Sequence, residues 1–401
     1  MIRFSSDYSE GAHPKILQAL IDTNMDQTGG YSEDPYCDRA KALILKALGA
    51  AEDAAAAAYG PEQARALAAG ADADHPVVHF LVGGTQTNLT AILACLRPHQ
   101  GVLCAPTGHI NVHETGAIEA CGHKVLPLPG IKEESLPYRH YGKITAEQID
   151  QAVKAHYADG AYEHIVQPGM VYISQPTEYG TIYSLDELKV ISAVCRSHGL
   201  PLFIDGARLG YALGSAQNDV TLRDLCQLAD IFYIGGTKVG MLFGEAVVIT
   251  NPAIAKDFRY LMKQKGGMLA KGRLLGVQFG AAFEPEGAAL KREGATLEPK
   301  GAALEPEGAD CLYLEMGRHA TSLAQKLKQG LVEAGCQLFI DSPTNQQFVV
   351  LEDSLAAKIG KEFAFEPFAR YDETHGIVRF CTSWATPPEH VDSLLKKLKE
   401  L

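Results

Sequence analysis

The sequence predicts an α/β protein built on a mostly parallel β-sheet, followed by a smaller α+β domain. Between residues 77 and 250, short apolar runs alternate with helix-like stretches, a pattern typical of parallel sheets covered by helices on both faces. After about residue 255 this alternation stops, and a chain of 401 residues exceeds the usual size of one domain. We therefore expect a large domain over residues 1–255 and a small C-terminal domain over residues 256–401.

Seven short apolar runs in the first part are strand candidates, at residues 77–82, 102–105, 125–128, 171–174, 202–205, 231–234 and 246–249. Two of the helices between them begin with capping boxes, Thr145-x-x-Gln148 and Ser184-x-x-Glu187. In the second part we expect a long helical stretch at 252–283, helices near 312–335 and 388–401, and strands at 347–351 and 376–381.

Two segments have the character of insertions. Residues from about 50 to 74 are rich in alanine and predict one helix and a loop. Residues 284–310 contain the heptad-like repeats EPEGAAL, KREGATL and EPKGAAL. Because glycine and proline recur in these repeats, a continuous coiled-coil helix is disfavoured. We expect a low-complexity surface segment that takes no part in the chemistry.

Composition and charge exclude several classes of function. The chain has 46% hydrophobic and 21% charged residues, as in ordinary soluble proteins. A formal net charge of -12 disfavours binding to nucleic acid. We find no apolar run of roughly 20 residues and no secretion signal, and the nine cysteines are scattered and never spaced CxxC. We therefore expect a cytoplasmic protein with reduced thiols that binds no membrane.

Two short motifs carry the main chemical signal, residues 205–208 (DGAR) and 235–238 (GGTK). Each follows a strand candidate, and open α/β sheets bind their ligands at the carboxyl ends of strands. A lysine can form a Schiff base with pyridoxal 5'-phosphate (PLP), and a carboxylate can keep the pyridine nitrogen protonated. Lys238 as a surface lysine and Asp205 as a helix cap are the structural alternatives. The apolar, glycine-flanked setting of Lys238 favours PLP.

A glycine-rich turn at residues 83–88 (GGTQTN) lies between a strand candidate and an amphipathic helix. Backbone N–H groups at such a helix start can bind a phosphate. An ordinary turn with Thr85 as the helix cap explains the same residues. His109 follows the strand candidate that ends at residue 105, where a histidine can stack on a cofactor ring and exchange protons.

Taken in this order and spacing, the motifs resemble the L-threonine aldolase and β-eliminating lyase family of fold-type-I PLP-dependent enzymes. The resemblance runs from Phe4 to about Phe283 and resumes near Cys311. Its landmarks are Ser6-Asp7, residues 30–35 (GYSEDP), the turn at 83–88, His109, residues 175–178 (QPTE), both motifs named above and Arg379.

The resemblance implies a role for each matching residue. Lys238 would form the Schiff base, Asp205 would pair with the pyridine nitrogen, and His109 would stack on the ring. Gly84, Thr85 and Thr237 would hold the phosphate of the cofactor. The substrate carboxylate would lie between Ser6, Arg208 and Arg379, because an arginine fork matches a carboxylate in geometry and charge. A structural salt bridge is the alternative for Arg379.

The reaction that the resemblance implies is PLP-dependent retro-aldol cleavage of L-threonine, L-allo-threonine and related β-hydroxy-α-amino acids, giving glycine and an aldehyde. His109 is the first candidate for the base that takes the β-hydroxyl proton, and His164 is the second. One alternative is β-elimination from cysteine, tyrosine or tryptophan-like amino acids. A non-catalytic PLP-binding protein is another, and we see no metal-ligand cluster.

The family resemblance also implies a homodimer or homotetramer with active sites at the dimer interface, where Tyr31, Glu33 and Asp34 would face the site of the partner. Two motifs depart from one branch of the family. That branch has Glu-Asn-Thr-His where this chain has residues 175–178, and a serine-rich approach to its lysine. The preferred side chain of the substrate and the choice between threo and allo forms therefore stay open.

Overall fold

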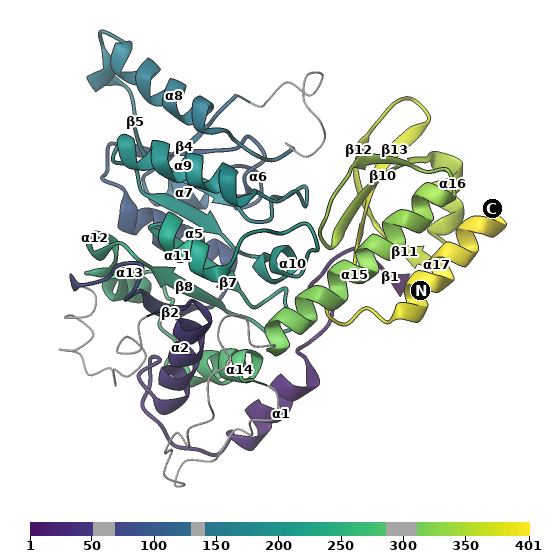
Figure 1. The fold of residues 1–401 in the computed structure, drawn as a ribbon, viewed down its shortest axis with the longest axis horizontal. Helices are drawn as coiled ribbons and strands as arrows, with labels where there is room; N and C mark the ends of the chain where they lie inside the picture. The colour runs from purple at the N-terminus through teal and green to yellow at the C-terminus, as the bar shows by residue number, and fades with distance from the viewer. Residues whose placement is uncertain (51–68, 130–140, 286–310) are drawn as a thin grey trace.

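The computed structural model describes residues 1–50, 69–129, 141–285 and 311–401. Most of the two predicted insertions, at 51–68 and 286–310, lies outside these described residues. A seven-stranded sheet forms the centre of the larger part of the molecule (Figure 1). A four-stranded sheet and two packed helices form the smaller part.

The seven strand candidates all form strands of the large sheet, in the order β2-β8-β7-β6-β5-β3-β4. These strands are β2 (Val77–Leu81), β3 (Gln100–Cys104), β4 (Lys124–Pro127), β5 (Gln167–Ser174), β6 (Leu202–Asp205), β7 (Ile231–Gly235) and β8 (Glu245–Ile249). β8 alone runs in the direction opposite to the other six strands. The prediction of a mostly parallel sheet is confirmed.

Helices cover both faces of this sheet because successive strand residues point to opposite sides. In β7, Phe232 and Ile234 join the core beneath one helix layer, whereas Ile231 and Tyr233 join the core on the other face. The first layer includes α2 (Pro35–Ala47), α8 (Ala146–Ala158), α9 (Leu185–Ser197), α11 (Leu222–Leu228) and α14 (Arg273–Phe283). The second includes α5 (Gly84–Cys95), α7 (Ala117–Ala120), α12 (Pro252–Ala255) and α13 (Phe258–Gln264).

The local signals at helix starts are confirmed, but one long helix is not. Both predicted capping boxes are present, at the starts of α8 and α9. The continuous helical stretch predicted over residues 252–283 is wrong, since α12, α13 and α14 are separate helices. Gly266, with a φ of 75°, follows α13 in the left-handed region, where a glycine commonly ends a helix.

The small part contains an antiparallel sheet in the order β12-β13-β10-β9. Its elements are α15 (Leu312–Glu333), β9 (Gln337–Ile340), β10 (Gln346–Glu352), α16 (Asp353–Ile359), β11 (Phe363–Ala364), β12 (Glu366–Arg370), β13 (His375–Cys381) and α17 (Pro388–Glu400). The two predicted strands are β10 and β13, and the two predicted helices are α15 and α17. Strands β9, β11 and β12 were not predicted.

The N-terminal segment connects the two parts. β1 (Ile2–Arg3) pairs in parallel with β11, although some 360 residues separate them, and α1 (Pro14–Asp22) then packs against α14. In Figure 1 both chain ends therefore lie beside the small sheet. The domain boundary near residue 255 stays a prediction. Within the described ranges, no helix is both long enough and apolar enough to cross a bilayer.

Candidate active site

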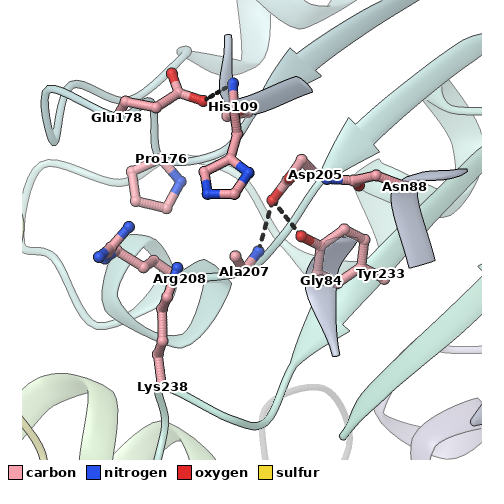
Figure 2. Close-up of a pocket in the computed structure, with 11 residues that line it drawn as sticks. Gly84, Asn88, His109, Pro176, Glu178, Asp205, Ala207, Arg208, Tyr233 and Lys238 are labelled. Atoms are coloured by element: carbon pink, nitrogen blue, oxygen red, sulfur yellow. Dashed lines mark hydrogen bonds between the residues drawn. The ribbon is translucent and has the colours of Figure 1, made fainter. Parts of the chain in front are cut away.

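A pocket lies at the carboxyl ends of β5, β6 and β7, next to the start of α5 (Figure 2). It holds about 380 Å³ of space, counting its open mouth. Its lining consists of Gly84, Asn88, His109, Ser174, Pro176, Glu178, Asp205, Ala207, Arg208, Tyr233 and Lys238. Five of the residues predicted to form the site are among these.

Asp205 ends β6 and is buried beneath the pocket. Its Oδ2 accepts hydrogen bonds from the Tyr172 hydroxyl at 2.6 Å and the Asn88 amide at 3.1 Å. Its Oδ1 accepts from the Tyr233 hydroxyl at 2.5 Å and from the Ala207 N–H at 2.9 Å. Burial favours the protonated acid, but these tyrosines and nearby His109 outweigh it and lower the pKa of Asp205. The site therefore holds a fixed negative charge, as a protonated pyridine nitrogen requires.

Lys238 lies in the loop between β7 and β8, and its side chain rises toward Arg208 (Figure 2). Among the described residues, none forms a hydrogen bond or ion pair with its amine. Burial and the neighbouring Arg208 guanidinium lower the pKa of Lys238. A lysine that deprotonates more easily is a better nucleophile toward an aldehyde, so this side chain fits Schiff-base chemistry.

A buried carboxylate, Glu245, holds the loop of Lys238 in place. Glu245 accepts hydrogen bonds from the Gly236 N–H at 3.0 Å and from the Thr237 hydroxyl at 2.9 Å. The prediction that Thr237 holds the phosphate is not supported, because its hydroxyl proton is already donated to Glu245. Thr237 also lies outside the residues that line the pocket. No signal in the sequence identified Glu245.

The first turn of α5 has free backbone donors at the edge of the pocket. Gly83 is its N-cap residue and has no side chain to satisfy the first N–H groups. A Cβ atom at Gly84 would lie 3.4 Å from the Tyr233 hydroxyl, so a larger residue would crowd this edge. Thr85 lies in the same turn and is exposed. These features fit a phosphate at the helix start.

His109 begins the short helix α6 (His109–Val112), and Figure 2 shows its ring between Pro176 and Asp205. The Nδ1 atom lies 2.7 Å from Glu114 Oε1, and a carboxylate there makes Nδ1 the proton donor. The Asn88 amide also donates to Glu114 Oε1, at 2.7 Å. A hydrogen-bonded chain thus connects His109 to Asp205 through Glu114 and Asn88, and it orients a ring whose side chain is 33% exposed. The sequence reading missed both connecting residues.

Arg208 is paired with a carboxylate that the sequence reading did not assign to it. Its Nε donates to Asp7 Oδ2 at 2.6 Å and its Nη2 to Asp7 Oδ1 at 3.0 Å. The amide of Asn345 donates to the same Asp7 at 2.9 Å. Two of the three Arg208 nitrogens thus contact Asp7, and the role of Arg208 in binding a substrate carboxylate stays a prediction that would depend on the third. The remaining Nη1 is available to the pocket, whose wall Arg208 forms.

Arg379 projects from β13 and carries a charge without a matching acid. Its Nη1 donates to Gln346 Oε1 at 3.1 Å and its Nη2 to the Ser5 carbonyl at 3.3 Å, while its Nε is buried without a partner. In the part of the chain that the structure describes, it has no carboxylate partner, so the salt-bridge alternative is unsupported. Ser6 adjoins Ser5, and its hydroxyl contacts that of Ser9 at 2.8 Å. A cation held by neutral oxygens suits an incoming carboxylate.

His164 and Tyr31 are two more predicted residues that do not line the pocket within one chain. His164 ends a 3-10 turn just before β5, whereas Ser174, at the far end of that strand, lines the pocket. The eight residues of β5 separate the two ends by roughly 23 Å, so His164 is wrong as a base supplied by the same chain. Tyr31 is 42% exposed, with Lys263 4.5 Å above its ring. Its role in the site of a partner stays a prediction.

Comparisons with known proteins agree with the predicted family and fold. The profile of the β-eliminating lyase family matches residues 9–354. The low specificity L-threonine aldolase of Pseudomonas aeruginosa is 29% identical, over 99% of this chain and 97% of its own length. The enzyme of the same name from a Pseudomonas species is 30% identical, over 93% of this chain and 98% of its own length.

Solved structures give the same picture. The threonine aldolase of Leishmania major superposes with a TM-score of 0.83 and 38% identity, covering 100% of this chain and 99% of its own. The aspartate aminotransferase of Thermus thermophilus, at 13% identity, has a TM-score of 0.62 over 100% of this chain and 91% of its own, which shows a shared fold alone. The prediction of a fold-type-I architecture is confirmed.

Proposed function

Because this chain belongs to the β-eliminating lyase family, a family of PLP-dependent lyases, we propose that it cleaves L-threonine, L-allo-threonine and related β-hydroxy-α-amino acids to glycine and an aldehyde. One observation carries this proposal. A lysine that pairs with no acid among the described residues and an ionised aspartate line one pocket, at the carboxyl ends of neighbouring strands and beside a helix start with no side-chain cap. Lysine, carboxylate and helix start are the three groups that PLP needs.

Each residue that would hold PLP would contact a different part of the cofactor. Asp205 would accept the proton of the pyridine nitrogen, the N–H groups of Gly84 and Thr85 would bind the phosphate, and His109 would cover the ring. Lys238 would hold the cofactor covalently through its amine. When bound, PLP accepts the electron pair that is released as a bond to Cα breaks.

Substrate orientation decides which bond to Cα breaks. Arg379 is the proposed anchor of the substrate carboxylate, because its guanidinium is held by Gln346 and Ser5 yet has no acid partner among the described residues. The free Nη1 of Arg208 and the Ser6 hydroxyl would complete this anchor. With the carboxylate fixed, the bond from Cα to the hydroxyl-bearing Cβ can be held perpendicular to the cofactor ring.

We further propose a cytoplasmic homodimer or homotetramer whose sites lie at a dimer interface. Several large apolar side chains on and just after α1, namely Leu17, Ile21 and Met25, are exposed in the isolated chain. Contact with a second copy would remove them from water. Light scattering of the purified protein measures the assembly, and a monomer would contradict it.

Product analysis tests the reaction directly. The purified protein with added PLP is incubated with L-threonine and with L-allo-threonine, beside a Lys238→Ala variant as control. We expect acetaldehyde and glycine in equal amounts from the wild type alone, and the ratio of the two rates gives the stereochemical preference. Release of pyruvate and ammonia from cysteine, with no acetaldehyde from either hydroxy-amino acid, would instead establish β-elimination.

A further inference from the structure

We propose that Glu178 is the base that accepts the proton of the substrate's β-hydroxyl group. The inference rests on the proposed aldol cleavage and assigns to one residue the proton transfer which that reaction requires. It corrects the expectation that a histidine does this work.

Glu178 is fixed at the pocket by one of its two carboxylate oxygens. Its Oε1 accepts hydrogen bonds from the Ser174 hydroxyl at 2.8 Å and from the backbone N–H of His109 at 2.9 Å. Figure 2 shows this carboxylate above Pro176 and His109, on the wall across the pocket from Lys238. Its other oxygen, Oε2, accepts no hydrogen bond from the side chain or backbone of another described residue and is not among the buried unpartnered atoms. One oxygen therefore positions the group while the other keeps its lone pairs free.

The loop that carries Glu178 is held from both sides. The N–H of Thr177 donates to the Thr181 carbonyl at 2.9 Å, and the side chain of Gln175 exchanges two hydrogen bonds with the backbone of Tyr183. The Gln346 amide reaches the Glu178 carbonyl at 3.5 Å, and Gln346 also contacts Arg379. A base on so constrained a loop keeps a fixed position relative to the proposed carboxylate anchor.

Other carboxylates near the pocket are committed elsewhere. Asp205, the second acid that lines it, accepts four hydrogen bonds. Asp7 accepts three, and both oxygens of Glu245 are bonded. Glu114 is buried behind His109 and does not line the pocket. Glu178 is thus the pocket-lining carboxylate with an uncommitted oxygen in the described part of the chain.

The histidines are less suited to this proton. Nδ1 of His109 already donates to Glu114, and the proposed stacking of its ring on PLP directs the face of the ring, rather than a nitrogen lone pair, at the reacting atoms. His164 lies at the amino end of β5, whereas the pocket lies at its carboxyl end. Burial raises the pKa of Glu178, and the charge of Asp205 adds to this, which outweighs the opposing hydrogen bonds. A carboxylate with a raised pKa is a stronger base.

The proposed step balances in atoms and electrons. The proton of the β-hydroxyl moves to Glu178 Oε2, the hydroxyl oxygen forms a carbonyl bond to Cβ, and the Cα–Cβ bond breaks. Bound PLP would supply the acceptor for the electron pair of that bond, and Cα then receives one proton. The products are glycine and an aldehyde, and Glu178 returns its proton so that no net proton is consumed.

A Glu178→Gln variant separates this role from a structural one. Glutamine keeps an Oε1 that can accept from Ser174 and His109, but an amide nitrogen replaces Oε2 and cannot accept a proton. We expect kcat for L-threonine to fall by about 10²- to 10⁴-fold, the usual contribution of general-base catalysis. KM and the visible absorption of bound PLP should stay within about threefold, on the order of what loss of a weak contact causes.

Hydrogen exchange on glycine is a second reaction, and its rate would fall if Glu178 had only a structural role in the pocket. Glycine has no β-hydroxyl group, so exchange of its α hydrogen with deuterium from solvent needs PLP but not the proposed base. We expect Glu178→Gln to exchange glycine at nearly the wild-type rate. Glu163→Gln, at an exposed glutamate beside His164, is the matched control and should leave both reactions unchanged.

Three results would overturn the inference in distinguishable ways. Wild-type cleavage of threonine by Glu178→Gln would show that another group takes the proton. Equal losses of threonine cleavage and glycine exchange would show that Glu178 merely supports the pocket. A wild-type protein that exchanges glycine but cleaves no β-hydroxy-amino acid would overturn the proposed function itself, and this inference with it.

Discussion

The buried pair between Asp7 and Arg208 allows a quantitative prediction. Asp7 is fully buried, and although burial favours its protonated form, Arg208 and Lys238 hold the pKa of Asp7 at about 2. An unfolded aspartate has a pKa of about 3.9, so the difference of about 2 units corresponds to about 2.6 kcal/mol of stability at pH 7. Removing one partner of a buried pair typically costs about 3–5 kcal/mol, because the other charge stays buried. We expect Asp7→Asn to lower the free energy of unfolding by about 3 kcal/mol.

The pH dependence of this loss has a definite direction. The folded-state pKa of Asp7 is lowered, so its contribution is fully present above about pH 5 and disappears as the pH falls toward 2. The asparagine variant lacks this titration. The difference between variant and wild type should therefore narrow as the pH is lowered from 5 to 3.

Urea unfolding at a fixed protein concentration measures both the loss of unfolding free energy and its dependence on pH. Trp384 is the only tryptophan of the chain, and its ring lies 5.7 Å from that of His13, so its fluorescence reports on unfolding near the N-terminal segment. The matched control is Asp353→Asn. Asp353 makes the same two-point contact with Arg370, but the two side chains are 55% and 57% exposed, and exposed pairs contribute little. If Asp7→Asn unfolds like the wild type, or if the difference stays constant down to pH 3, the reasoning is wrong.

Three further substitutions test the proposed site. Lys238→Ala should abolish both the visible absorption of bound PLP and the cleavage reaction, since the amine that would hold PLP is removed; a variant that still cleaves threonine would remove Lys238 from the mechanism. Asp205→Asn should keep one of the two tyrosine contacts, through its remaining oxygen, yet reduce kcat/KM on the order of 100-fold, and steady-state rates near those of the wild type would contradict its charge role. Arg379→Lys should raise KM for threonine by about 10- to 100-fold while changing kcat less, because a lysine cannot reproduce the fork; an unchanged KM would place the carboxylate elsewhere.

The sequence predicted the fold well where its signals were local. Buried parallel strands are apolar over their full width, so each of the seven runs stood out, and the capping boxes marked two helix starts. The break near Gly266 was missed because apolar residues on both sides of it continue a helix-like pattern. The strand pairing of Ile2 with Phe363 depends on tertiary contact, which no local pattern contains.

The candidate site was predictable in part for the same reason. The positions of Asp205 at the end of one strand and of Lys238 shortly after another were enough to predict that both belong to a ligand site. The pairing of Arg208 with Asp7 spans 201 positions, so the sequence offered no sign that the fork was occupied. The sequence does carry a signal at Glu178, because one branch of the family has histidine where this chain has glutamate. We interpreted that change only as a source of doubt about substrate preference.

The path of the N-terminal segment affects the order in which a ribosome can complete this protein. β1 has no strand to pair with until Phe363 and Ala364 have been made, and Asp7 lacks its Asn345 contact until residue 345 has been made. The large sheet can therefore assemble while the rest of the chain is still being translated, since all of its strands end by Ile249. Until residue 345 has been made, the Asp7 that pairs with Arg208 lacks its contact with Asn345. A nascent chain halted before residue 345 should thus hold a folded sheet but an unfinished active site.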